Sequence, residues 1–167
     1  IAGISYIGFA FIHFIYLAAL NTSTVTVFGS ELTLSSAFIW LAFLGTWASD
    51  TFAFFVGSKF GKHKLCPQIS PAKTVEGFIG GIIGSTIILI LLAKLFNFLL
   101  LPTAILGLII GFIAPLGDLI ESSIKRYTMI KDSGTLLPGH GGVLDRFDSA
   151  MIVIPIVYYY LQYINLY

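Results

Sequence analysis

Long apolar runs constrain the fold of this sequence more than any other feature. A membrane-spanning helix needs about 20 consecutive apolar residues, and five segments approach that length: residues 1–20, 34–56, 77–100, 103–122 and 149–166. The chain is 57% hydrophobic and only 10% charged, whereas a soluble domain has roughly 25% charged residues. The sequence therefore predicts an all-α, polytopic membrane protein, with about five transmembrane helices in a single domain over residues 1–167.

Charged residues gather in two polar segments. All of the 17 charged residues except Glu31 and Lys94 lie within residues 50–76 or 118–148. If the helices alternate in direction, the loops 57–76 and 123–148 share one side of the membrane, and they hold eight of the nine basic residues. The positive-inside rule makes that side cytoplasmic. We therefore expect two polar cytoplasmic loops to form the functional site.

Overall charge argues against a nucleic-acid partner. The formal net charge is +1, and no basic face recurs along the chain. The single cysteine, Cys66, has no partner within the chain for a disulfide and no neighbours at zinc-ligand spacing.

Small residues recur at four-residue spacing, which is typical of helices that approach closely in lipid. Examples are the pairs Gly80/Gly84 and Gly107/Gly111. These spacings predict that the third and fourth apolar helices are central.

The end of the fourth apolar segment carries a polar face. Asp118, Glu121, Ser122 and Lys125 fall at i, i+3, i+4 and i+7, so they share one side of a helix. A carboxylate near the membrane is costly without a partner, water or a cation, which makes Asp118 a functional candidate. The alternative is an ion pair between Asp118 and Lys125 at the helix end.

A second acidic group opens the fifth apolar segment, where Asp145, Asp148 and Ser149 fall at i, i+3 and i+4. Like charges this close need a positive group between them, and Mg²⁺ accepts carboxylates together with substrate phosphates. The alternative is that these carboxylates complement the helix dipole, with Arg146 as the counter-ion. Because antiparallel helices joined by this loop bring their ends together, we expect Asp118 to join Asp145 and Asp148 in one metal site.

Two further segments favour phosphate binding. The turn from Pro138 to Gly142 has glycines that can direct backbone N–H groups at an anion, and His140 within it either binds phosphate or holds the loop. Upstream, Ser70-Pro71 predicts the N-cap and first residue of the third helix. That start would place Lys73 in the first helical turn, as a point charge for a phosphate.

Together these residues resemble the signature of the phosphatidate cytidylyltransferase (CDP-diacylglycerol synthase) family. The matching elements run without gaps: Ser122-x-x-Lys125-Arg126, Lys131-Asp132, Pro138-x-His140-Gly141-Gly142 and Asp145-Arg146-x-Asp148. Two upstream segments are also similar, Asp50-x-x-Ala53-x-x-x-Gly57 and Ile69 to Gly77, so that the resemblance spans about residues 45–149. Ala72 and Phe54 depart from the family pattern, where lysine and tyrosine are usual.

The resemblance implies transfer of the cytidylyl group of CTP to phosphatidate, with Mg²⁺ as cofactor, and it leaves a second cation open. It assigns metal binding to Asp118, Asp145 and Asp148, and phosphate binding to Lys125, Arg126, Lys131 and Arg146. Further substrate contacts are expected at Ser70, Lys73, Asp132, His140, Gly141 and Gly142. Family members are longer at the amino terminus, so we expect this chain to be a carboxy-terminal portion.

The expected partners are CTP, phosphatidate and bilayer lipid, and a homodimer is a further expectation. For a bacterial source, the site would face the cytoplasm at the cell inner membrane.

Two alternative functions stay open. One is a related CTP-dependent lipid enzyme, such as a polyprenol or phytol kinase or a CDP-archaeol synthase. The other is an ion-coupled transporter, which also has intramembrane carboxylates but keeps them near the midplane.

Overall fold

The computed structural model describes residues 2–27, 29–129 and 144–167, and the side chains of residues 6–27, 29–129 and 147–167. Its helices are α1 (Ala2–Ala18), α2 (Leu34–Phe60), α3 (Val75–Phe96), α4 (Leu100–Tyr127) and α5 (Leu144–Tyr163). Its strands are β1 (Thr24–Val27), β2 (Ser30–Thr33), β3 (Lys64–Cys66) and β4 (Ser70–Thr74). The fold is therefore mostly helical, as predicted.

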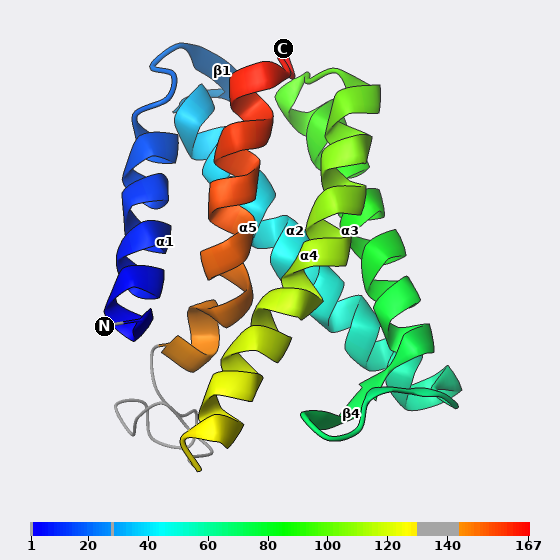
Figure 1. Cartoon of the computed structure of the whole chain (residues 1–167). Coiled ribbons are helices and arrows are strands. Elements are labelled where there is room, and N and C mark those ends of the chain that lie inside the picture. Colours follow the sequence, from blue (N-terminus) through cyan, green and yellow to red (C-terminus); the bar gives the residue numbers. More distant parts are fainter. Residues whose placement is uncertain (1, 28, 130–143) are drawn as a thin grey trace.

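Each helix packs chiefly on a small set of neighbours. α2 packs along α3, α3 along α4, α4 along α5, and α5 along α1, while α2 crosses behind the others (Figure 1). Three helices, α2, α3 and α4, are long and apolar enough to cross a membrane, and the apolar part of α1, Tyr6–Ala18, is shorter. These helices give the protein its membrane character.

The fourth helix extends beyond the apolar segment at both ends. The apolar segment was expected over 103–122, with a polar helical face continuing to Lys125, and α4 runs from Leu100 to Tyr127. Asp118 lies nine residues before the helix ends, about 14 Å along the axis. Hydropathy marks only the apolar part of a helix, whereas the backbone stays helical through the polar Ser122–Tyr127 stretch.

Two small hairpins correct the all-α prediction. β1 pairs with β2, and β3 pairs with β4, in both cases antiparallel. The second hairpin contains Ser70 to Thr74, so the predicted helix start at Ser70 is wrong. Thr74 is the N-cap of α3, because its side-chain oxygen accepts a hydrogen bond from the Gly77 N–H at 3.1 Å. Lys73 therefore lies in a strand.

Close approach of α3 and α4 depends on two glycines, in agreement with the predicted small-residue packing. A Cβ atom at Gly107 would lie 2.8 Å from the Thr86 Cα, and one at Gly111 would lie 2.6 Å from the Ile82 Cα. Both obstructing atoms belong to the backbone, so a side chain at either position would force the helices apart.

Pro115 lies inside α4, four residues beyond Gly111, and α4 is bent along its length (Figure 1). Proline lacks the N–H that would bond the Gly111 carbonyl one turn back. Ser49 of α2, which is fully buried, points its hydroxyl at this carbonyl at 3.5 Å. A serine side chain thus serves the acceptor that the proline leaves open, as is usual where proline interrupts a membrane helix.

We predict that Gly111→Leu destabilises the fold because the new side chain would meet the α3 backbone. Overpacking typically costs about 1–3 kcal/mol, which should lower the midpoint of thermal unfolding in detergent. Gly8→Leu is the matched control, because a Cβ atom at Gly8 meets nothing within 4 Å. Equal midpoints for the two variants would contradict the packing described here.

Candidate active site

Three carboxylates converge where α4 meets α5. Asp118, Glu121 and Asp148 each present an oxygen atom within 4.8 Å of the others. Asp118 and Asp148 are half-buried, and Glu121 is 2% exposed. Three negative groups in a partly buried space repel one another unless positive charge compensates them. We call this group the acidic cluster.

Gly117 allows the acidic cluster to form. A Cβ atom at Gly117 would lie 2.9 Å from the Ser149 Cα and 3.1 Å from the Asp148 carbonyl oxygen. Ser149 is 3% exposed at this contact. The glycine therefore brings the two helix backbones together, and a residue adjacent to this contact on each helix, Asp118 after Gly117 and Asp148 before Ser149, supplies a carboxylate. Gly117 was not among the predicted site residues, although its place directly before an aspartate in an apolar helix was a signal.

Two lysines supply positive charge at the acidic cluster. The Lys73 Nζ lies 2.7 Å from Asp118 Oδ2 and donates to the Pro115 carbonyl at 3.2 Å. The Lys125 Nζ lies 2.9 Å from Glu121 Oε2, one helical turn away. Asp118 thus pairs with a lysine from β4, and Lys125 pairs with Glu121, instead of the Asp118–Lys125 pair considered as an alternative.

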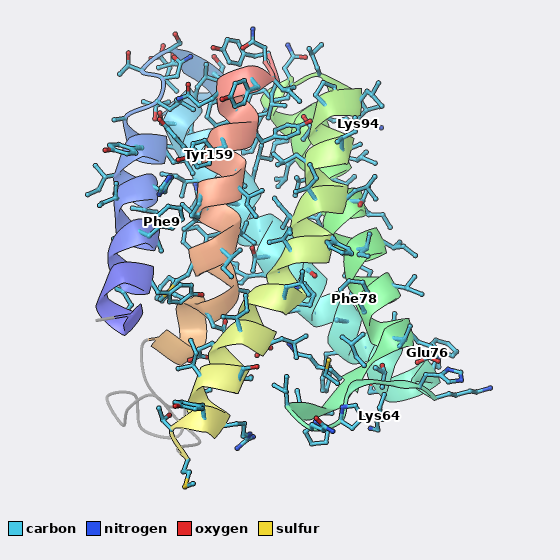
Figure 2. The ribbon with its side chains drawn as sticks, viewed as in Figure 1. Phe9, Lys64, Glu76, Phe78, Lys94 and Tyr159 are labelled. Carbon is cyan, nitrogen blue, oxygen red and sulfur yellow. The ribbon has the colours of Figure 1, made fainter. Side chains whose placement is uncertain are left out.

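Glu76 holds the β3–β4 hairpin in the position from which Lys73 reaches the cluster. Its Oε2 accepts hydrogen bonds from the backbone N–H groups of Lys62 and His63, at 3.1 and 3.2 Å. Its Oε1 lies 2.6 Å from the His63 Nδ1. Figure 2 shows Glu76 and Lys64 at one end of the molecule and Lys94 at the other. The hairpin is therefore tied to the first turn of α3.

A cleft of about 460 Å³ opens beside the acidic cluster, between α2, α3, α4 and the hairpin. Asp50, Lys73 and Asp118 line it together with the aromatic rings of Phe54 and Phe78. Asp50 lies within an expected helix but was not among the predicted site residues. Its position could have indicated a role in the site, because a carboxylate inside a membrane helix is a functional candidate by default.

The remaining predicted residues are only partly described by the structure. Ser70 begins β4, where it pairs with Cys66, and Arg126 is exposed in the last turn of α4. Asp145 and Arg146 lie in the first turn of α5, but their side chains fall outside the described part. The other five predicted residues fall outside the described residues altogether: Lys131, Asp132, His140, Gly141 and Gly142.

The donor set at this site suits a hard divalent cation. Its side-chain donors are carboxylate oxygens, which Mg²⁺ and Ca²⁺ prefer, and the described part holds no cysteine or histidine in the cluster. Among the described residues, Lys73 pairs with Asp118 and Lys125 pairs with Glu121. A lysine beside a cleft, such as Lys73, also suits a phosphate.

Comparison with known proteins agrees with the resemblance in the motifs. The model of the cytidylyltransferase family matches residues 1–164. The chain is similar to the phosphatidate cytidylyltransferase of Bacillus subtilis (strain 168), with 44% identity over 162 residues, covering 93% of this chain and 55% of the relative. It is also similar to the enzyme of that name from Staphylococcus saprophyticus, with 50% identity over 122 residues, covering 72% of this chain and 47% of the relative.

This chain thus spans about half the length of the curated relatives it matches. The family match extends over nearly all of its own residues, including the acidic cluster, the cleft and the hairpin that carries Lys73. The chain therefore belongs to the cytidylyltransferase family.

Proposed function

We propose that this chain forms the catalytic part of a phosphatidate cytidylyltransferase. The enzyme would transfer the cytidylyl group of CTP to phosphatidate, giving CDP-diacylglycerol and pyrophosphate. The observation that carries the proposal is the acidic cluster beside Lys73 and an open cleft, in a chain of this family. The names of the Bacillus and Staphylococcus relatives support the same activity.

The chemistry of this reaction fits a site built from charges. An oxygen of the lipid phosphate attacks the α-phosphorus of CTP, and the bond from that phosphorus to the bridging oxygen of the β-phosphate breaks. Pyrophosphate leaves with the electron pair. Because the nucleophile is already ionised at neutral pH, the site needs no general base, and catalysis comes from positioning and charge neutralisation.

Mg²⁺ is the proposed cofactor, and it would neutralise phosphate charge and hold the reacting phosphates together. Asp118, Asp148 and Asp145 are the proposed ligands, and Glu121 joins them on the evidence of the acidic cluster. A second cation remains part of the proposal on the family resemblance alone.

Basic groups would bind and orient the phosphates. Lys73 lines the cleft, so it can exchange its contact with Asp118 for one with a phosphate of CTP. Lys125 would act from the α4 side of the cluster. The same role is proposed, from the family resemblance, for the remaining predicted residues: Ser70, Arg126, Lys131, Asp132, His140, Gly141, Gly142 and Arg146.

The proposed topology has five membrane spans and a cytoplasmic site. The β3–β4 hairpin, the end of α4 and the start of α5 lie at one end of the bundle (Figure 1), and most of the basic residues belong to that end. The positive-inside rule assigns that end to the cytoplasm, at the inner membrane if the source is bacterial like the relatives. A homodimer and the lack of a nucleic-acid partner remain predictions.

The activity is tested by measuring pyrophosphate release from CTP by purified protein, with and without phosphatidate, and by identifying the lipid product. We predict phosphatidate-dependent release and CDP-diacylglycerol as product. Asp148→Asn should lower turnover by about 100-fold or more, the scale on which partners of a metal matter, and should weaken Mn²⁺ binding measured by electron paramagnetic resonance. Glu31→Gln, at an exposed carboxylate in β2, is the matched control. A phosphorylated lipid alcohol as product would instead indicate a kinase.

Lys73→Met should raise the KM for CTP or lower kcat, because it removes a cation from the cleft wall. The expected loss in kcat/KM is about 100-fold, the usual scale for one well-placed electrostatic contact. Lys59→Met is the matched control, because Lys59 is exposed and its Nζ lies over the Phe60 ring. Equal kinetics for the two variants would exclude Lys73 from the site.

The topology predicts the side from which single cysteines react. In a Cys66→Ser background, Lys59→Cys should react with an impermeant thiol reagent only from the cytoplasmic side. Ser23→Cys, which precedes β1 at the opposite end, should react only from the other side. Labelling of both cysteines from the same side would contradict this topology.

A further inference from the structure

An apolar groove of about 470 Å³ runs between α1, α2 and α5, on the other side of α5 from α4. Its walls come from residues 7–14 of α1, Phe43 of α2 and residues 147–154 of α5, and every lining side chain is apolar. The proposed transfer reaction, as described above, does not use this groove.

One end of the groove meets the acidic cluster. Phe147 lines the groove, and the next residue, Asp148, belongs to the cluster. On α1, Ile7 lines the groove, and the preceding Tyr6 points its hydroxyl at the Asp148 carbonyl oxygen at 3.5 Å. From Phe147 to Ile154 the groove follows α5 for about 10 Å, away from the proposed cytoplasmic end.

Polar contacts beyond the groove hold α1 beside α5. His13, which is 5% exposed, lies 2.8 Å from the Phe9 carbonyl oxygen and 3.1 Å from the Tyr159 hydroxyl of α5. Because the carbonyl only accepts, the His13 Nδ1 donates to it. Figure 2 shows Phe9 and Tyr159 at this contact. The groove is therefore a defined space between tied helices.

The groove opens at the outer surface of the bundle. Phe11 and Phe147 on its walls are 62% and 43% exposed, and α1 forms one edge of the bundle (Figure 1). An open apolar groove of this kind suits a lipid chain that enters sideways from the bilayer.

We propose that this groove holds one acyl chain of the lipid substrate while the lipid phosphate lies at the acidic cluster. The inference rests on the proposed function, because it assumes a lipid with a reactive phosphate. The cleft lined by Asp118 and Lys73 would take the nucleotide from one side of the cluster, and the groove beside Asp148 would admit the lipid from the other.

The groove would promote the reaction by fixing the position of the lipid phosphate. Lipid tails are as apolar as the groove, so transfer of a chain from the bilayer brings no hydrophobic gain. A chain packed beside Asp148 does limit where its phosphate can lie, and such positioning lowers the barrier of a reaction between two bound groups. The groove should therefore affect the KM for long-chain lipid and leave soluble short-chain lipid unaffected.

Chain-length dependence tests the inference. Ala150→Leu and Ala10→Leu fill the groove, and Ala104→Leu on α4 is the matched control. We expect the filling variants to raise the KM for dioleoyl phosphatidate about tenfold, the effect of about one misplaced methylene group. The KM for dihexanoyl phosphatidate should stay unchanged.

A truncation on the groove wall gives a second test. Phe11→Ala, which cannot clash with a bound chain, should also raise the KM for dioleoyl phosphatidate, whereas Phe9→Ala on the same helix should not. Equal effects on both chain lengths would overturn the inference.

Photo-crosslinking provides a readout that does not depend on turnover. Phosphatidate with a diazirine on its acyl chain should label peptides spanning residues 7–14 and 147–154, and unlabelled dioleoyl phosphatidate should compete. Equal labelling by phosphatidylcholine with the same chain would mean that ordinary bilayer lipid fills the groove. No labelling by either lipid would mean that another protein segment covers it. Either result overturns the inference, whereas the lack of product from unaltered protein with both chain lengths overturns only the proposed function.

Discussion

Repulsion among carboxylates at the α4–α5 contact is the constraint on which the site depends. Asp118, Glu121 and Asp148 lie within 4.8 Å of one another, and the close contact at Gly117 leaves them little room to separate. Positive charge relieves this repulsion, first from lysine and then, in our proposal, from metal ions. The proposed transfer reaction would use the same carboxylates, because metal ions held there would offset the charge of two phosphate substrates.

The contact between Lys73 and the acidic cluster depends on the β3–β4 hairpin and on the bend in α4. Lys73 comes from a hairpin that Glu76 ties to α3, and it contacts both Asp118 and the Pro115 carbonyl. The bend at Pro115 presents that carbonyl, and Ser49 serves the acceptor one turn earlier. The interruption of α4 at Pro115 thus provides a carbonyl contact for Lys73. The buried Ser49 hydroxyl offsets the backbone hydrogen bond that the proline cannot make.

The acidic cluster lies between two cavities whose linings differ in polarity. The cleft has charged walls from α2, α4 and β4, whereas the groove between α1 and α5 is wholly apolar. A nucleotide and a lipid differ in the same way, and a reaction that joins them needs access from water and from the bilayer. This division supports a membrane-surface enzyme over a transporter, which would pass one solute through a central path.

The sequence by itself determined the membrane character, the family and the shared face of Asp118 and Glu121, because apolar length, motif order and helical period are local properties. Only the tertiary structure decided which lysine meets Asp118, because this pair depends on contacts that no local pattern encodes. Lys73 reaches the site from a strand whose pairing depends on a hairpin and on Glu76. The distance between Asp118 and Asp148 likewise depends on Gly117 meeting Ser149 across two helices, and only tertiary packing sets such a distance.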